Sequence, residues 1–258
     1  MLQEQWLLHE IMPSVLERLK SQLETSLNIL SKQSKTDSLP LSSTKNESLK
    51  GYISLNGPYI TKAELTVRLA NHQDTQSKAM ITPAYPYFLE QIQQGTNYMI
   101  LAAECIMSIK PSLLTKQTMV ELLETVRQYT DRAQLAFEYP NESELFPYKV
   151  CHPKHFTPPL KEDLVIEFCV QDIYIVCSTF GIKFAAHHND PQASCVTYKD
   201  KTAWIVDQSR TQTQSPMLTE LKESFRSIRE ICQTYRFMLL QTNVVELIPQ
   251  QQQATNSI

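Results

Sequence analysis

The chain has 258 residues, of which 42% are hydrophobic, and a formal net charge of -3. This hydrophobic content is enough for a packed core, and the near-neutral charge argues against a nucleic-acid-binding protein, which usually has a strong basic excess. The four glycines are too scattered for a phosphate-binding loop or a nucleophile elbow, so the common nucleotide-binding folds are not expected.

The N-terminal segment predicts a helix over residues 3–31. Its apolar residues recur every three or four positions, as on one face of a helix: Leu8, Ile11, Val15, Leu19, Leu23, Leu27 and Leu30. Glu4 and Glu10 interrupt the apolar character of this segment, so we expect no signal peptide and a cytoplasmic protein. Residues 32–48 are rich in serine, lysine, threonine and asparagine, which predicts a flexible linker.

A β-hairpin is predicted next. Residues 52–55 form its first strand, and Asn56-Gly57-Pro58 has the composition of a turn. Residues 63–69 alternate apolar and polar side chains, as a half-buried antiparallel strand does. A polar connection is expected over residues 71–86.

Two helices with a short break are predicted in the middle of the chain. The first covers residues 87–109, carries apolar residues at heptad spacing and ends before Pro111. The second begins near Ser112, or near Thr118, which has capping-box spacing with Glu121. The proline break indicates an antiparallel helical hairpin.

Residues 139–159 contain several prolines and aromatic residues and are predicted to form an extended loop. Four short segments after it are enriched in β-branched and aromatic side chains, which predicts strands. They are residues 164–170, 173–177, 195–198 and 203–206, the last two with the weaker pattern.

The last predicted element is a helix from Pro216, whose apolar residues alternate by three and four positions. This seam comprises Leu218, Leu221, Phe225, Ile228, Cys232, Tyr235, Leu239 and Thr242. Such a seam beside other amphipathic helices is more often intramolecular core than a dimer interface. A disordered tail is expected over residues 249–258.

Together these elements predict an α+β protein, with an antiparallel four-helix bundle and an antiparallel β module inserted between the helices. The bundle comprises residues 1–31, 86–138 and 215–248. The β module comprises residues 49–82 and 148–208.

Cys151, His152 and His155 form the most metal-like cluster, since thiolate and imidazole bind zinc. Their spacing provides no good chelating pair and no fourth ligand, so a proline-rich surface loop is the favoured interpretation. The run His187-His188-Asn189-Asp190 is likewise interpreted as a polar loop. No CxxC motif occurs, and because no secretory signal is expected, the six cysteines are expected to be reduced core residues.

No acid–base pair stands out in the sequence. Glu162-Asp163, and Asp37 with Glu47, can be ranked only when a pocket is known, and solvated charges are the favoured interpretation. Cys232 lies in the seam of the last helix, where a thiol is buried and protonated, so we expect a core role. We therefore predict no catalytic residue, no metal and no cofactor.

Several short segments, taken in order, resemble the Rogdi family. They are Trp6-Leu7-Leu8-His9-Glu10, Lys50-Gly51-Tyr52-Ile53-Ser54-Leu55-Asn56-Gly57, Leu89 with Gln91-Ile92-Gln93, and Pro159-Leu160 with Asp163-Leu164-Val165-Ile166. The resemblance extends from about Trp6 to Phe184 and includes the C-terminal helix in general. It does not place residues 183–216.

The Rogdi family includes the second subunit of the fungal RAVE complex, a regulator of the vacuolar and endosomal proton-pumping ATPase. The resemblance implies an elongated protein with a helical bundle, a β domain and no catalytic residues. Its implied partners are a large propeller-containing RAVE subunit and the peripheral sector of the ATPase, which would recruit it from the cytoplasm to vacuolar and endosomal membranes.

Two other functions stay open at this point. One is a trafficking or tethering adaptor unrelated to the proton pump, and the other is a small metalloenzyme that uses the cluster from Cys151 to His155. No nucleic acid is expected among the ligands, and no transmembrane segment either. The longest mostly apolar stretch, residues 98–109, contains Glu104 and is shorter than the roughly 20 residues that a membrane span needs.

Overall fold

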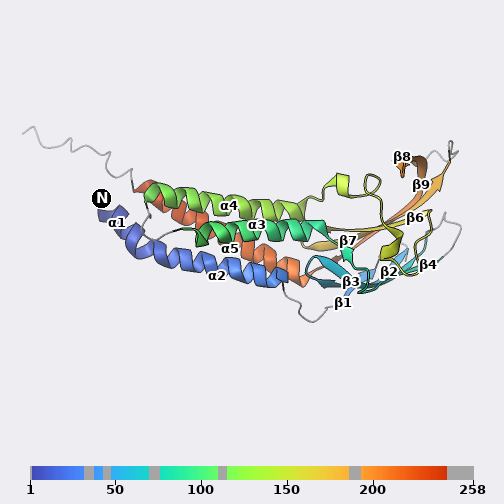
Figure 1. Cartoon of the computed structure of the whole chain (residues 1–258), viewed down its shortest axis with the longest axis horizontal. Helices are drawn as coiled ribbons and strands as arrows, with labels where there is room; N and C mark the ends of the chain where they lie inside the picture. Colours follow the sequence, from blue (N-terminus) through green and yellow to red (C-terminus); the bar gives the residue numbers. More distant parts are fainter. Residues whose placement is uncertain are drawn as a thin grey trace, which may run out of the picture. The chain divides into compact units, whose positions relative to one another are not determined.

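The computed structural model describes residues 2–31, 38–42, 48–69, 76–109, 115–185 and 193–242. Its helices and strands are labelled in Figure 1. The helices are α1 (Leu2–Trp6), α2 (Met12–Ser31), α3 (Glu90–Met107), α4 (Lys116–Glu138) and α5 (Pro216–Gln241). A π-helical segment, Leu7–Ile11, joins α1 to α2.

The first sheet is antiparallel and contains five strands. In spatial order they are β1 (Ser38–Ser42), β2 (Leu49–Asn56), β3 (Tyr59–Val67) and β4 (Ser77–Ile81), with β5 (Tyr87–Phe88) also paired to β3. The predicted hairpin is confirmed as β2 and β3. At Gly51 an added Cβ would lie 1.9 Å from the Glu64 carbonyl oxygen, so only glycine allows the two strands to approach this closely.

The second sheet is also antiparallel and contains the four strands predicted in the C-terminal half. Their spatial order is β6 (Leu164–Gln171), β7 (Tyr174–Phe184), β9 (Lys201–Gln214) and β8 (Ser194–Tyr198). A two-residue turn joins β8 to β9, and Lys199 and Asp200 in this turn have φ angles of 52° and 58°. Positive φ at both positions is the pattern of a type I′ turn, whose twist matches that of the strands.

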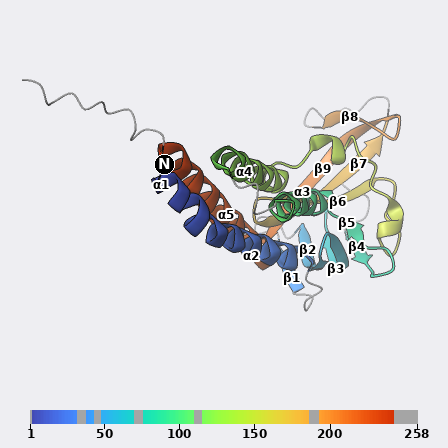
Figure 2. The same ribbon diagram turned by 60° about the vertical axis from the view of Figure 1, so that its left-hand side comes forward.

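The predicted class, α+β, is correct, but the predicted arrangement of a four-helix bundle with one inserted β module is wrong. The strands form two separate sheets (Figure 2), and the compact units divide the helices. The first unit comprises the described parts of Met1–Ser26, Tyr98–Arg132 and Ser224–Ile258, and the second comprises those of Leu27–Asn97 and Ala133–Glu223. The second unit thus contains both sheets and one end of each of α2, α3, α4 and α5.

Side-chain contacts within the first unit define how its helical segments pair. In α4 and α5, Glu124 lies 3.3 Å from Arg236 and Asp131 lies 3.8 Å from Arg229, so the two helices run antiparallel. Between α2 and α5, the hydroxyls of Ser26 and Ser224 lie 2.7 Å apart in a buried hydrogen bond.

The first predicted helix is confirmed, but its buried stripe differs from the prediction. Two residues of the predicted stripe, Ile11 and Leu27, are only half-buried, and four residues outside it are buried, namely Leu7, Met12, Ser26 and Ile29. Met12 is buried where Ile11 was expected, because the wider π-helical turn before it shifts the following residues around the axis. Ser26 is fully buried where Leu27 was expected. Three- and four-residue spacing therefore located the helix but not every core position.

Three local predictions need correction. The segment expected as a linker, 32–48, contains β1, and the polar connection, 71–86, contains β4. Tyr87 begins β5 rather than a helix, since Tyr87 and Phe88 pair with Ile60 and Tyr59 of β3, and α3 begins only at Glu90. At the start of α4, Thr115 and Thr118 bind each other's backbone N–H through their hydroxyls, so the capping pair is these two residues and not Thr118 with Glu121.

Candidate partner-binding surface

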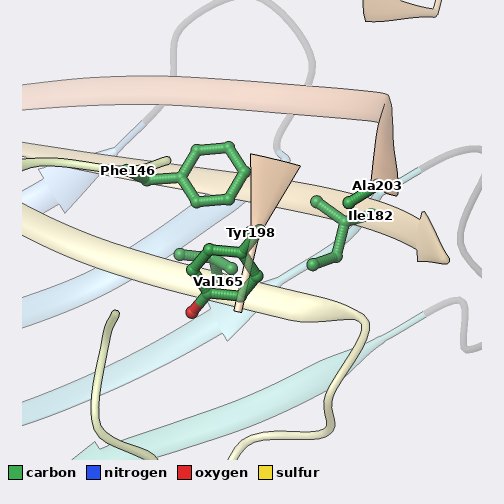
Figure 3. Close-up of a cluster of buried hydrophobic side chains, with 5 residues drawn as sticks. All are labelled: Phe146, Val165, Ile182, Tyr198 and Ala203. Carbon is green, nitrogen blue, oxygen red and sulfur yellow. The ribbon is translucent and has the colours of Figure 1, made fainter. Parts of the chain in front are cut away.

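The loop after α4 is anchored to one face of the second sheet by Phe146. The Phe146 ring stacks on Phe180 of β7 at 4.6 Å and meets Tyr198 of β8 edge-on at 5.1 Å. Figure 3 shows this ring with the buried side chains around it, Val165, Ile182, Tyr198 and Ala203. Buried aromatic contacts of this kind fix the position of a loop that has little regular structure of its own.

Glu167 provides a second anchor for the same loop. Its carboxylate is buried and accepts a hydrogen bond from the backbone N–H of Phe146 at 2.7 Å. Burial raises the pKa of Glu167, while the Phe146 N–H and the positive charge of Arg210 oppose that rise. Glu167, Ser178 and Arg210 occupy paired positions on three neighbouring strands, so they form one polar row across this face.

A cleft of about 660 Å³ lies between this loop and the sheet. Its polar side is formed by the row of Glu167, Ser178 and Arg210. Its apolar side includes Tyr139 and Phe180, and the remaining lining residues are Pro140, Glu142, Leu145, Cys169, Gln208 and Ser209. The cleft therefore combines apolar walls with a few fixed polar groups, as binding clefts in proteins usually do.

A smaller hollow of about 120 Å³ shares Tyr139, Pro140, Leu145 and Cys169 with the cleft. Its other side is formed by the start of α3 and by Phe88 of β5. Lys149 lies at its rim in ion pairs with Glu90, at 3.5 Å, and with Glu144. The charged groups of this hollow are thus paired with one another.

Exposed aromatic side chains line these hollows or lie next to residues that line them. Tyr139 is 71% exposed and lines both of them, and Tyr148 of the same loop is 73% exposed. Phe88 is partly exposed and packs against Tyr59 at 5.3 Å. We call this region the Tyr139 surface, defined by the cleft, the smaller hollow and these four aromatic residues. Aromatic residues are enriched at protein interfaces, because they bury a large area with little loss of conformational entropy.

The rings of His152 and His155 meet edge-on with their centroids 6.3 Å apart, and the Cys151 thiol binds a different group. The Cys151 thiol donates to the Ile166 carbonyl at 3.0 Å, and burial raises its pKa to about 11. His152 accepts the Lys154 N–H at its Nδ1, and the His155 ring packs on Tyr87 at 5.5 Å. Within the described ranges, no three histidine, cysteine or acidic side chains are placed to hold a metal.

The remaining candidates from the sequence do not gather at a common site. Asp37, Glu47 and the run His187-His188-Asn189-Asp190 lie outside the described residues. Glu162 is exposed, and neither it nor Asp163 lines the two hollows. Cys232 is buried in α5, and burial raises its pKa to about 12, so its expected core role is confirmed.

Sequence reasoning missed the Tyr139 surface. The segment 139–159 was predicted to be an extended loop, and the structure confirms this apart from short 3₁₀ turns at Glu142–Glu144 and Pro153–His155. Its aromatic residues were the available signal, since a loop that carries Tyr139, Phe146 and Tyr148 has both an anchor and exposed contact groups.

The seam of α5 is confirmed as part of the chain's own core. Leu218, Leu221, Phe225, Ile228, Cys232 and Leu239 are all buried, and Tyr235 is half-buried. A coiled-coil dimer would need these side chains on the surface. In the part of the chain that the structure describes, no helix is long and apolar enough to span a membrane.

Comparison with known protein families gives a match over most of the chain. The family model described as Rogdi leucine zipper containing protein matches residues 3–230. No curated protein matches the sequence. Because the family model covers most of the chain, the protein belongs to the Rogdi family.

Proposed function

We propose that this chain is a non-catalytic adaptor subunit of a RAVE-like complex that promotes assembly of the vacuolar-type proton-pumping ATPase. Its partners would be a large propeller-containing subunit and the peripheral, ATP-hydrolysing sector of the pump. The protein would act from the cytoplasm and reach vacuolar and endosomal membranes through these partners. Membership of the Rogdi family supports this proposal.

The structural observation that carries the proposal is the Tyr139 surface. Exposed Tyr139 lines both hollows, and exposed Tyr148 belongs to the same loop, which Phe146 anchors to the second sheet. A rigid surface loses little conformational entropy when a partner binds, so its contacts contribute more fully to affinity. The acidic groups nearest the hollows support a binding role, since Glu167 accepts a backbone N–H and Glu90 and Glu144 pair with Lys149.

The proposed mechanism is positional. An adaptor that holds the peripheral sector close to the membrane channel raises the effective concentration of one for the other, and it selects orientations that can associate. No chemical step on a substrate is needed for this effect. The adaptor must therefore bind both bodies, directly or through the propeller-containing subunit, at the same time.

Affinity purification of the tagged full-length protein from its native cells tests this proposal. We expect mass spectrometry to recover the propeller-containing subunit and peripheral ATPase subunits with the wild type. Tyr139→Ala combined with Phe88→Ala should reduce that recovery, whereas Phe237→Ala, an aromatic residue 61% exposed on α5, should not. Recovery of neither partner, with a stable trafficking or tethering protein instead, would favour the tethering function.

A further inference from the structure

We propose that the outer edge of β8 accepts an extended, acidic segment of a partner protein as an additional strand of the second sheet. β8 is the last strand in the order β6-β7-β9-β8. The strand comprises Ser194–Tyr198, and every residue in it except Tyr198 is at least partly exposed. An edge strand presents a row of backbone donors and acceptors, and a peptide that pairs with them gains affinity from main-chain hydrogen bonds.

The register of the β8–β9 hairpin shows which groups face outward. In a two-residue turn the flanking residues, here Tyr198 and Lys201, form a hydrogen-bonded pair. Hydrogen-bonded and non-hydrogen-bonded pairs alternate along antiparallel strands, so Val196 also faces β9 with its backbone groups. The N–H and C=O groups of Cys195 and Thr197 are therefore directed away from β9.

The same rule can be checked on β6, the opposite edge of this sheet. Its hairpin closes at Gln171 and Tyr174, so the rule directs the backbone of Ile166, Phe168 and Val170 outward. The structure has hydrogen bonds at these positions. The Ile166 carbonyl binds the Cys151 thiol, the Phe168 N–H binds the Tyr87 hydroxyl, and Val170 binds the side-chain amide of Gln91.

Three other outer strands, β6, β4 and β1, are each protected from pairing with another chain. Side chains occupy four of the outward groups of β6, as described above. β4 exchanges two backbone hydrogen bonds with Thr157 through Met80, and β1 carries Pro40, which has no N–H, and lies beside β9. Prolines and covering segments are the usual means by which proteins block sheet edges.

Among the residues that the structure describes, none of these protections is present at β8. It contains no proline and no charged residue, and within the described ranges no hydrogen bond is present at the outward groups of Cys195 and Thr197. Both side chains are exposed on the same face as Trp204, which pairs with Cys195. An uncharged edge whose outward groups have no partner among the described residues is the arrangement that strand addition uses.

Three lysines determine the charge of the preferred partner. Lys199 lies in the turn at the end of β8 beside Asp200, Lys201 is the first residue of β9, and Lys183 of β7 pairs with Trp204 of β9. The ammonium groups of Lys199 and Lys201 lie over the rings of Tyr198 and Phe184, and in the described part of the chain none of the three lysines forms an ion pair with a carboxylate. Aspartate or glutamate residues at the ends of the incoming strand would neutralise them.

A defined peptide tests this inference on the full-length protein. The probe is a synthetic peptide of alternating valine and threonine with aspartates at both ends, and binding is followed by fluorescence anisotropy and by amide hydrogen exchange. We expect slower exchange at Cys195 and Thr197. Thr197→Pro, which removes an outward N–H, should weaken binding about tenfold, whereas Thr197→Val, which keeps it, should bind as the wild type does.

Two further arms separate the alternatives. The double charge reversal Lys199→Glu with Lys201→Glu should weaken the binding of the aspartate-ended peptide and strengthen the binding of a lysine-ended one. Equal affinity of Thr197→Pro and Thr197→Val, or no binding of the probe to the wild type, would overturn the inference. A concentration-dependent dimer that Thr197→Pro abolishes would overturn it as well, because the edge would then belong to a second copy of this chain. This test needs no ATPase subunit, so its outcome is independent of the proposed function.

Discussion

The side-chain amide of Gln91 forms hydrogen bonds with both the backbone N–H and the backbone carbonyl of Val170. Gln91 Nε2 donates to the Val170 carbonyl at 2.8 Å, and the Val170 N–H donates to Gln91 Oε1 at 2.7 Å. The same Nε2 also donates to the Ala136 carbonyl at 2.8 Å, at the end of α4. One side chain at the start of α3 thus takes the place of a neighbouring strand for β6 and links it to α4.

Gln91→Met tests this role, because methionine has a similar volume and cannot form these hydrogen bonds. We expect the free energy of unfolding to fall by about 2–4 kcal/mol, since each buried backbone group left unpaired costs about 1–3 kcal/mol. Urea denaturation measures the change. Gln93→Met is the matched control, as Gln93 binds only exposed Asn97 and should change stability by less than about 0.5 kcal/mol. Equal effects of the two variants would show that Gln91 has no special role.

Gly95 and Phe137 form a size-matched pair between α3 and α4. A Cβ added at Gly95 would lie 2.5 Å from Cζ of Phe137, so Gly95→Ala must displace the ring. We expect a loss of about 1 kcal/mol, because overpacking costs about 1–3 kcal/mol and alanine regains about 1 kcal/mol of helix propensity. In a Phe137→Leu background the same substitution should become neutral or stabilising. Thermal denaturation of the wild type, the two single variants and the double variant measures the coupling between the two positions. If Gly95→Ala lowers the stability equally in both backgrounds, the packing explanation is refuted.

Ser26 and Ser224 should respond unequally to removal of their hydroxyls. Ser26 donates to the Gln22 carbonyl at 3.0 Å, so the Ser224 hydroxyl is the donor in their shared hydrogen bond. Ser26→Ala leaves that buried donor unpaired and should cost about 1–3 kcal/mol. Ser224→Ala leaves Ser26 bonded to Gln22 and should cost less, and the double variant should resemble Ser224→Ala. If chemical denaturation shows the two single variants to be equally destabilised, the assigned direction of the hydrogen bond is incorrect.

Glu124 should make the stability of the protein depend on acid pH. Hydrogen bonds and charge from Arg127 lower the pKa of Glu124 to about 2 in the folded chain, from 4.5. Because the folded pKa is the lower one, this stabilisation is present above about pH 4.5 and is lost as the pH falls towards 2. Unfolding followed between pH 5 and pH 2 should show a smaller loss of stability for Glu124→Gln and for Arg127→Gln than for the wild type. A wild-type pH dependence in both variants would contradict this assignment.

Local patterns in the sequence predicted most of the helices and strands correctly. A helix that buries one face repeats its apolar residues every three or four positions, as in the seam from Leu218 to Leu239. A strand that buries one face repeats them every second position, as in β3. Such a repeat shows which face is buried but not which element covers it. The prediction of a single β module was therefore wrong, since nothing in β2 or β6 alone indicates that the strands divide into two sheets.

The features that define the Tyr139 surface and the β8 edge depend on contacts distant in sequence. Phe146 reaches Tyr198 across more than fifty positions, and Gln91 reaches Val170 across 79. Pro40 and Thr157 were visible in the sequence, but their protective roles follow only from the strands beside them. The sequence could show that β8 lacks charge and proline, while its position at the edge of a sheet required the fold.

The most direct test of the proposed function measures the peripheral ATPase sector on purified vacuolar or endosomal membranes, in cells with and without this protein. The account predicts less peripheral sector on the membranes of cells that lack the chain, with unchanged amounts in whole-cell extracts, and restoration by the wild type but not by Tyr139→Ala combined with Phe88→Ala. Equal amounts of membrane-bound peripheral sector in both kinds of cell would contradict the role in pump assembly.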